Sequence, residues 1–508
     1  LLARAEHASR DGKAVLKSTS QMATDRALIK SAIKLVETQE MAPERAIWEA
    51  ATSFADQMAA LGGYMAERVT DIHDVRARIV AELTGQQAPG IPVSDEPFIL
   101  AAIDLAPADT ATLDPEKVIA LITSDGGPQA HTAILARGLG LPAIVAAKGV
   151  TDIADGTVVY VDSNEGIVDT EPTDADREAA IKYANRKPVA DFDGKGVLAD
   201  GTRVELYANV GDGKSAEKAA SLKAEGVGLL RTEFGFLGHD AEPSIETQAK
   251  TYKSVFDAFP GKHIVVRTLD AGADKPLPFL NVNPEENPAL GVRGFRTDWT
   301  VPGVLTRQLQ AIKAASEDSD ADIWVMAPMI STTSEARNFA NMLKEIGLPV
   351  HGVMVETPAA VMNAEAILGE VDFVSIGTND LTQYTMAADR LLGDLAHLNN
   401  PWQPAVLKMI KMTVEGAQRA SVTAGKKKYV SVCGEAAADP ALAVVLIGLG
   451  VDTLSMNAGA IPAVAAVLKS VTKEKAQQIA AIALQQISSA EAKESARKAL
   501  PILDELGL

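Results

Sequence analysis

The chain has very little cysteine, since Cys433 is the only one among 508 residues. One cysteine cannot form a disulfide within the chain, and this suits the reducing cytoplasm. Long apolar runs are also missing, because the stretches at 441–451 and 458–468 are shorter than the roughly 20 residues that cross a bilayer. No secretory signal opens the sequence. We therefore expect a cytoplasmic protein without membrane insertion.

Positive charge is in deficit. Lys and Arg number 48 against 67 Asp and Glu, which gives a formal net charge of −19. A nucleic-acid-binding protein needs clustered Lys and Arg to displace phosphate counterions, and the three lysines at 426–428 are too few. The composition therefore argues against nucleic acid as a partner. The hydrophobic content of 47% and charged content of 23% are ordinary for an α/β protein of several domains.

The spacing of apolar residues divides the chain into three regions and a linker. Residues 1–84 have the periodicity of a small helical bundle, with Pro43 suited to the first turn of a helix. Its two apolar faces contain Ile47, Phe54, Met58 and Leu61, and then Ile72, Val75, Ile79 and Leu83. Residues 85–173 open with a Gly/Pro stretch and hold short apolar strands at 98–105, 118–123, 142–146 and 158–162. Residues 174–193 are polar and are predicted to form a linker helix.

Residues 194–508 contain eight apolar runs separated by helical stretches, the pattern of a TIM barrel. The predicted strands are 204–209, 227–233, 264–270, 323–330, 352–356, 373–380, 429–435 and 453–457. In this fold the active-site side chains lie at the C-terminal ends of the strands. The polar residues that follow these runs are therefore the candidate functional residues.

Arginines follow several of these strands. Arg231 and Arg267 come directly after apolar runs that face a packed barrel, and Arg293, Arg390 and Lys275 add to the positive charge. Taken one at a time, each arginine is as well explained by an Arg–Glu network that closes the barrel top. Taken together, they favour a small, highly anionic substrate, because guanidinium groups match phosphate and carboxylate in bidentate geometry.

Carboxylates and a thiol occupy other strand ends. Glu356 and Asp380 carry the oxygen ligands that Mg²⁺ prefers, although helix capping is the alternative for each, since a Thr-Pro pair follows Glu356. Cys433 also ends a strand, where a lone cysteine is usually a small buried hydrophobic residue. Beside Glu435 and other acidic groups its thiol is expected to keep its proton, while nearby arginines act in the opposite direction. A protonated thiol can act as a general acid toward an enolate.

The run D-G-G-P-Q-A-H-T-A-I-L-A-R, residues 125–137, follows the apolar strand at 118–123. Its glycines allow a tight turn, and Ile134 and Leu135 then begin a helical pattern, which places His131 at a helix start. Unpaired N–H groups and the helix dipole there stabilise an anion on the ring and favour the neutral imidazole. A single histidine near such a turn is more often a cap or an exposed loop residue. The anion-binding strand ends elsewhere in the chain favour a phosphate carrier.

Seven motifs, in order along nearly the whole chain, resemble those of enzyme I of the phosphoenolpyruvate:sugar phosphotransferase system. They are D-G-G-P-Q-A-H-T-A-I, G-V-G-L-L-R-T-E-F, V-V-R-T-L-D, E-E-N-P-A-L-G-V-R, M-V-E-T-P-A-A, D-F-V-S-I-G-T-N-D-L-T-Q-Y-T-M-A-A-D-R and V-C-G-E. The resemblance implies a multidomain α/β protein in which a helical bundle is inserted in a swivelling β/α phosphohistidine domain, followed by a (β/α)8 TIM barrel. It implies residues 1–84 as the bundle that binds the histidine phosphocarrier protein HPr, 85–173 as the phosphohistidine domain and 194–508 as the phosphoenolpyruvate-binding barrel. A homodimer through the barrel is also expected.

The resemblance also implies a role for individual residues. It makes His131 the residue phosphorylated at Nε2 by phosphoenolpyruvate, from which HPr takes the phosphate as the first step of sugar uptake. Cys433 resembles the acid that protonates enolpyruvate to pyruvate. The groups around the substrate are then the phosphate-binding Arg231, Arg267 and Arg390 with Asn379, and the Mg²⁺ ligands Glu356 and Asp380.

The sequence departs from the family at two places. Ala130 stands where the family often has a serine before the active histidine. Family members also carry a β segment ahead of the helical bundle that is absent here, so we expect part of the sheet supporting His131 to be missing. Pyruvate phosphate dikinase and phosphoenolpyruvate synthase share these domains, but no Gly-rich nucleotide-binding segment precedes His131. A catalytically silent docking protein is a further alternative, and the retained histidine, thiol and carboxylates argue against it.

Overall fold

The computed structural model contains two compact units, Leu1–Ile181 and Lys182–Leu508, which are described separately below. It describes residues 20, 22–61, 69–86, 90–92, 94–105, 109, 113–114, 117–125, 132, 136, 141–163, 166–184, 189–237, 239–271, 277–280, 285–390 and 392–508.

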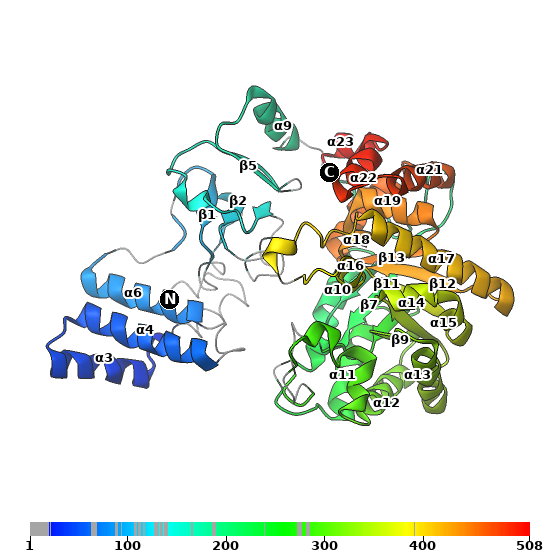
Figure 1. Cartoon of the computed structure of the whole chain (residues 1–508), viewed down its shortest axis with the longest axis horizontal. Helices are drawn as coiled ribbons and strands as arrows, with labels where there is room; N and C mark the ends of the chain where they lie inside the picture. The colour runs from blue at the N-terminus through cyan, green and yellow to red at the C-terminus, as the bar shows by residue number, and fades with distance from the viewer. Residues whose placement is uncertain are drawn as a thin grey trace. The chain divides into compact units, whose positions relative to one another are not determined.

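The first unit begins with the helices α3 (Arg26–Gln39), α4 (Pro43–Leu61) and α6 (Val69–Thr84), which pack on one another (Figure 1). The side chain of Asp25 caps α3 by accepting hydrogen bonds from two backbone N–H groups, and Pro43 opens α4, as predicted. Ile47 and Ile72 are buried in the bundle core. Leu83 was expected on the packed face, but it is 52% exposed because it lies in the last turn of α6.

The same unit contains a small parallel sheet and a two-stranded ribbon. The strands are β1 (Phe98–Ala102), β2 (Val118–Thr123) and β3 (Ala143–Ile144) in the order β1-β2-β3, and the antiparallel pair β4 (Tyr160–Asp162) and β5 (Ile167–Asp169). The four predicted strands are confirmed, although most are shorter than predicted. The three-residue strand β5 was not predicted. The predicted polar helix is α9 (Asp174–Ala184), which has no buried residue and spans the boundary of the two units.

The second unit is a closed barrel of eight parallel strands. They are β6 (Glu205–Val210), β7 (Gly226–Arg231), β8 (His263–Arg267), β9 (Asp322–Ala327), β10 (His351–Val355), β11 (Phe373–Gly377), β12 (Tyr429–Cys433) and β13 (Thr453–Met456). Each pairs with the next, and β13 pairs with β6 to close the barrel. All eight predicted strands are confirmed. Several end earlier than predicted, since the polar residues after them already belong to loops or to the first turn of a helix.

Helices surround this barrel (Figure 1). Those between the strands are α10 (Gly213–Ser221), α11 (Ile245–Phe256), α12 (Val304–Glu317), α13 (Thr333–Ile346), α14 (Pro358–Met362), α15 (Ala364–Glu370), α16 (Thr378–Met386), α17 (Pro404–Ala424), α18 (Glu435–Ala438) and α19 (Pro440–Leu449). After β13 come α20 (Ile461–Leu468), α21 (Lys473–Leu484), α22 (Ser489–Lys498) and α23 (Ile502–Leu506). The short 3₁₀ helices η3 (Pro288–Leu290) and η4 (Gly294–Trp299) lie between β8 and α12.

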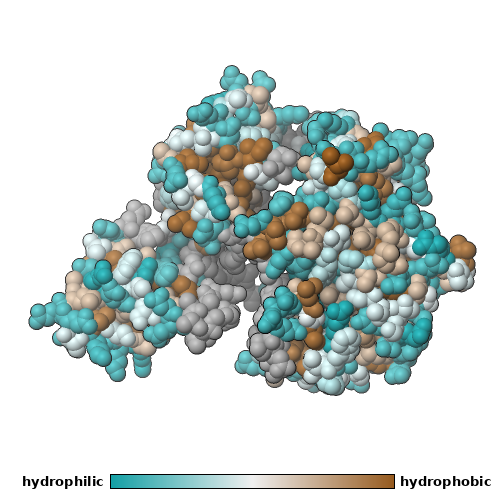
Figure 2. Space-filling model, viewed as in Figure 1, coloured by the Kyte–Doolittle hydropathy of each residue, from teal (hydrophilic) through white to brown (hydrophobic). Residues whose placement is uncertain are grey.

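Strand side chains alternate between the barrel interior and the helices. Val353 and Val355 of β10 join the large core shared with the helices, whereas Met354 between them packs inside the barrel with Cys433. The most apolar run of the sequence is α19, which is buried because α17, α21 and α22 pack around it. Within the described part of the chain, no helix is both long and apolar enough to span a membrane. The visible surface is mostly hydrophilic, with smaller apolar groups (Figure 2).

Candidate active site

The candidate residues gather where the barrel strands end. Arg231 and Arg267 are the last residues of β7 and β8 and lie side by side in register. Helix α16 begins directly after β11, so Asn379 and Asp380 fall in its first turn. Cys433 ends β12 at the level of Gly377 in β11. The parallel barrel thus brings residues that are distant in the sequence to one end.

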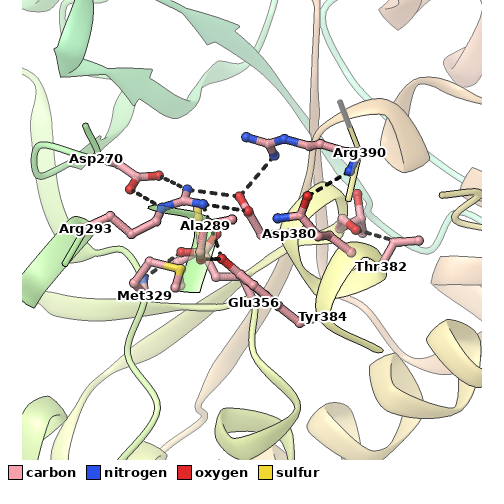
Figure 3. Close-up of polar contacts among 12 residues, drawn as sticks. Asp270, Ala289, Arg293, Met329, Glu356, Asp380, Thr382, Tyr384 and Arg390 are labelled. Atoms are coloured by element: carbon pink, nitrogen blue, oxygen red, sulfur yellow. Dashed lines mark hydrogen bonds and ion pairs between the residues drawn. The ribbon is translucent and has the colours of Figure 1, made fainter. Parts of the chain in front are cut away.

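Arg293 lies at the centre of this cluster, immediately before η4. Its Nε and Nη2 donate to the two carboxylate oxygens of Asp270, at 3.1 and 2.8 Å, and its Nη1 and Nη2 donate to Asp380, at 2.9 and 3.3 Å (Figure 3). Only 4% of the Arg293 side chain is exposed. Arg390 adds a second cation at Asp380, with Nη1 3.3 Å from Oδ2. Two carboxylates and two guanidinium groups therefore form one network, which is buried except for the partly exposed Arg390.

Arg267 extends this network to the 3₁₀ turn that follows β7. Its Nη2 donates to Oε1 of Glu233 at 2.5 Å, and its Nη1 lies 3.4 Å from Oδ2 of Asp270. Arg267 Nε and Glu233 Oε2 are buried, yet neither has a hydrogen-bond partner among the described residues. A buried polar atom left unpaired costs about 1–3 kcal/mol, so these two atoms are suited to a ligand that pairs with them.

The sequence left two explanations open for the arginines, a structural network or an anion site. Three of them, Arg267, Arg293 and Arg390, pair with carboxylates. Arg231 is different, because its partly exposed guanidinium makes no hydrogen bond or ion pair with the residues that the structure describes. The network therefore accounts for three arginines and leaves Arg231 available to an anion.

Asp270 was not among the predicted site residues, although it ends the motif V-V-R-T-L-D. Burial alone would raise the pKa of its carboxyl, but Arg293 and Arg267 outweigh burial and lower the pKa to about 2. Asp270 is thus a permanent anion that holds two of the arginines in place. Its pairing with Arg293 depends on the path of the long loop after β8, which no local pattern in the sequence specifies.

Glu356 follows β10 and is almost completely buried. Its Oε1 accepts a 2.6 Å hydrogen bond from the backbone N–H of Met329, and its Oε2 lies so close to Gly377 that a Cβ there would be 2.7 Å away. Burial, together with the negative charges of Asp380 and Asp270, raises the pKa of Glu356 to about 8. The cap of α14 is the next residue, Thr357, so Glu356 has no capping role.

Glu356 and Asp380 fit a divalent cation. Glycine at position 377 leaves room for the carboxylate, and the mutual repulsion that raises the pKa of Glu356 is the interaction that a dication would relieve. Among the described residues there is no group of three or more His, Cys, Asp and Glu placed to hold a metal. Mg²⁺ commonly uses one or two protein carboxylates and takes its other ligands from water and substrate.

The thiol of Cys433 is 3% exposed and donates to the carbonyl of Ile376, with Sγ 3.5 Å from the oxygen. Burial raises the pKa of this thiol, and the charge of Glu356 acts in the same direction, while Arg267 and Arg231 act against it. The thiol therefore keeps its proton at neutral pH, as expected. The main cause is burial, whereas the sequence had suggested Glu435 and other acidic groups, of which Glu356 contributes.

Two of the predicted residues, His131 and Lys275, lie outside the described residues, as does Ala130. The residue after His131 is described. Thr132 is 1% exposed, and its hydroxyl donates to Oδ1 of Asp104 at 2.7 Å. This hydrogen bond ties the position next to His131 to the segment that follows β1.

Three family models match the chain in succession. Residues 1–68 match the N-terminal domain of PEP-utilising enzymes, residues 94–166 match their mobile domain, and residues 190–473 match their PEP-binding domain. The last match contains the whole residue cluster described above.

Three similar curated proteins are each named phosphoenolpyruvate-protein phosphotransferase. The protein from Streptomyces coelicolor is 45% identical over 98% of this chain and 89% of its own length. The protein from Haloferax volcanii is 39% identical over 89% of this chain and 81% of its own length. The protein from Staphylococcus carnosus is 37% identical over 84% of this chain and 77% of its own length.

Proposed function

Because the chain belongs to the phosphoenolpyruvate-protein phosphotransferase family, we propose that it transfers the phosphoryl group of phosphoenolpyruvate to its own His131 and then to HPr, releasing pyruvate. The proposal rests on the barrel-end cluster. In it lie a guanidinium with no partner among the described residues, a buried protonated thiol and two carboxylates. An anionic substrate, an acid and a cation site are what this reaction requires.

The substrate phosphate binds to the guanidinium groups of Arg231, Arg267 and Arg390, with the amide of Asn379 as a further donor. Arg231 makes no ion pair with the described residues, and Arg267 has one N–H without a partner, so both can bind the phosphate without first losing a protein contact. Arg293 and Lys275 complete the positive charge around the substrate. The arginines also draw charge away from the bridging oxygen as the P–O bond breaks.

Glu356 and Asp380 would hold Mg²⁺. When bound there, the ion would offset charge on the substrate phosphate and on the enolate oxygen. Asp380 is already ion-paired with Arg293 and Arg390, so the arginines and the metal share this carboxylate.

His131 accepts the phosphoryl group and Cys433 supplies the proton. An N–P bond forms at Nε2 of His131 as the P–O bond of phosphoenolpyruvate breaks. The electron pair of the P–O bond stays on the oxygen, which becomes the enolate oxygen of pyruvate. The methylene carbon of that enolate takes the proton of the Cys433 thiol and gives pyruvate. The thiolate then regains a proton from solvent. Protonation at carbon removes the enolate and drives the transfer forward.

HPr then takes the phosphate from His131 by docking on the helical bundle of α3, α4 and α6, as the first step of sugar uptake. We place the reaction in the cytoplasm, because Cys433 must remain a thiol. Two barrel units associate as a homodimer in this proposal, and sedimentation velocity of the full chain tests this association.

Label transfer tests the function directly. The full chain is mixed with phosphoenolpyruvate labelled on phosphate, with Mg²⁺, and with or without HPr. We expect an acid-labile label on the protein that moves to HPr and is absent from His131→Ala. The exposed His239 supplies a control, since His239→Ala should label like the unchanged protein. Failure to label the unchanged chain, or label retained in His131→Ala, would overturn the proposal.

A further inference from the structure

Tyr384 joins three parts of the barrel end. It stands four residues after Asp380 on α16, so the two side chains share one face of the helix. Its hydroxyl donates to the carbonyl of Ala289 in η3, and its oxygen lies 3.4 Å from Nη1 of Arg293, which donates to it (Figure 3). One hydroxyl therefore contacts both the main chain before Arg293 and the guanidinium of Arg293 itself.

The direction of these hydrogen bonds is fixed. A tyrosine hydroxyl has one hydrogen to donate, and here Ala289 accepts it. The lone pairs of the oxygen are left to accept from Arg293. Nη1 of Arg293 has two hydrogens, and its acceptors are Asp380 Oδ1 at 2.9 Å and Tyr384 Oη at 3.4 Å. Asp270 holds the other edge of the guanidinium through Nε and Nη2.

The proposed function, on which this inference rests, gives Asp380 a second task as a metal ligand. A dication on Asp380 competes with Arg293 for the same oxygens and repels its positive charge. Nη1 of Arg293 is buried, so when the metal takes Asp380 this N–H loses its acceptor. A buried N–H without an acceptor destabilises the folded protein. Tyr384 Oη is the acceptor already in place on that nitrogen.

We propose that Tyr384 is a positioning residue that keeps the guanidinium of Arg293 in place when Asp380 binds the metal. Asp270 and Tyr384 then hold the guanidinium from its two sides, and Arg293 stays directed at the substrate. Without the hydroxyl, the unloaded site still has Asp380 as acceptor for Nη1, whereas the loaded site has none. Loss of the hydroxyl therefore penalises the metal-loaded form selectively.

The test measures binding of Mn²⁺ alone, without substrate, by electron paramagnetic resonance on the full chain. We expect Tyr384→Phe to weaken Mn²⁺ binding about five- to tenfold, the size expected for one hydrogen bond to a charged group. Thermal stability without metal should fall only by the loss of the hydrogen bond to Ala289, which the metal-free and metal-loaded forms share. Tyr207→Phe is the matched control, because the Tyr207 ring packs against His263, the first residue of β8, whereas Asp380 lies beyond the other ends of the strands. This variant should leave Mn²⁺ affinity unchanged.

A second variant separates this inference from the proposed function. Asp380→Asn should abolish tight Mn²⁺ binding. If Asp380→Asn does so while Tyr384→Phe binds Mn²⁺ like the unchanged protein, the role of Tyr384 is overturned and the metal site stands. If Asp380→Asn binds Mn²⁺ normally, the metal assignment fails and the role of Tyr384 fails with it. Equal weakening by Tyr384→Phe and Tyr207→Phe also overturns the inference, since it indicates a general loss of packing.

Discussion

Replacing Glu356 by Gln should stabilise the barrel unit, and more so as the pH rises. Glu356 has a pKa of about 8 in the folded protein, against an ordinary value of 4.5. Between these values the folded state binds more protons than the unfolded state, so stability falls as the pH rises. The loss of folding stability caused by ionised Glu356 is absent below pH 4.5 and complete above pH 8.

The size of this stabilisation follows from the difference between the folded and unfolded pKa values of Glu356. At about 1.4 kcal/mol per pKa unit, the ionised carboxylate destabilises the fold by roughly 4 kcal/mol at about pH 8 and by roughly 1 kcal/mol at about pH 5.5. The glutamine side chain of the variant is neutral at both pH values, and its amide oxygen can still accept from Met329 N–H. The difference in free energy of unfolding between Glu356→Gln and the unchanged protein should therefore grow by about 3 kcal/mol, in favour of the variant, across this range.

Urea unfolding with a metal chelator, repeated from about pH 5.5 to about pH 8.5, measures this difference. Tryptophan fluorescence suits the assay, because three of the four tryptophans, Trp299, Trp324 and Trp402, lie in the barrel unit. Glu365→Gln is the control, since Glu365 is an exposed carboxylate paired with Arg419. Curves of stability against pH that run parallel for Glu356→Gln and the unchanged protein would refute the reasoning.

Two further substitutions test separate roles in the site. Cys433→Ser should slow pyruvate formation by about a hundredfold or more, the contribution of a positioned general acid, with phosphoenolpyruvate binding nearly unchanged. Pyruvate release is followed by its reduction with lactate dehydrogenase, and unchanged turnover would remove the thiol as the acid. Arg231→Ala should raise the KM for phosphoenolpyruvate by about tenfold or more, yet leave urea unfolding unchanged, because Arg231 has no ion pair among the described residues to lose. A loss of stability with an unchanged KM would show that this arginine is structural.

The barrel could be predicted from the sequence because each strand is a short apolar run with its own signal. An apolar run followed by polar residues marks a strand wherever it lies in the chain, so all eight were found. Strand ends were predicted too long at β8 and β11. Asp270 directly follows Leu269, with no turn residue to mark the end of β8, whereas the prediction for β11 ran on through residues 378–380, where α16 already begins. The three-residue strand β5 is too short for any periodicity to show.

The residue types of the site were also predictable, whereas their partners were not. Arg293 and Asp380 are 87 residues apart, and their contact depends on the path of the loop that carries η3 and η4. Asp270 was not predicted, because a carboxylate after a strand has many possible roles. Which arginine contacts it depends on the path of the loop after β8. Tyr384 gave the one local signal, its i, i+4 spacing from Asp380, but an aromatic residue on a helix is usually part of the core.

Positive and negative groups nearly balance at the end of the barrel. The described cluster has four guanidinium groups, on Arg231, Arg267, Arg293 and Arg390, and four carboxylates, on Glu233, Asp270, Glu356 and Asp380. With a pKa of about 8, Glu356 is mostly protonated at neutral pH, so the cluster is positive and attracts an anion. A dication at Glu356 must displace that proton, and an anionic substrate beside it lowers the energetic cost of the added charge. Metal and phosphoenolpyruvate should therefore strengthen each other's binding, and linkage requires that they do so by the same factor.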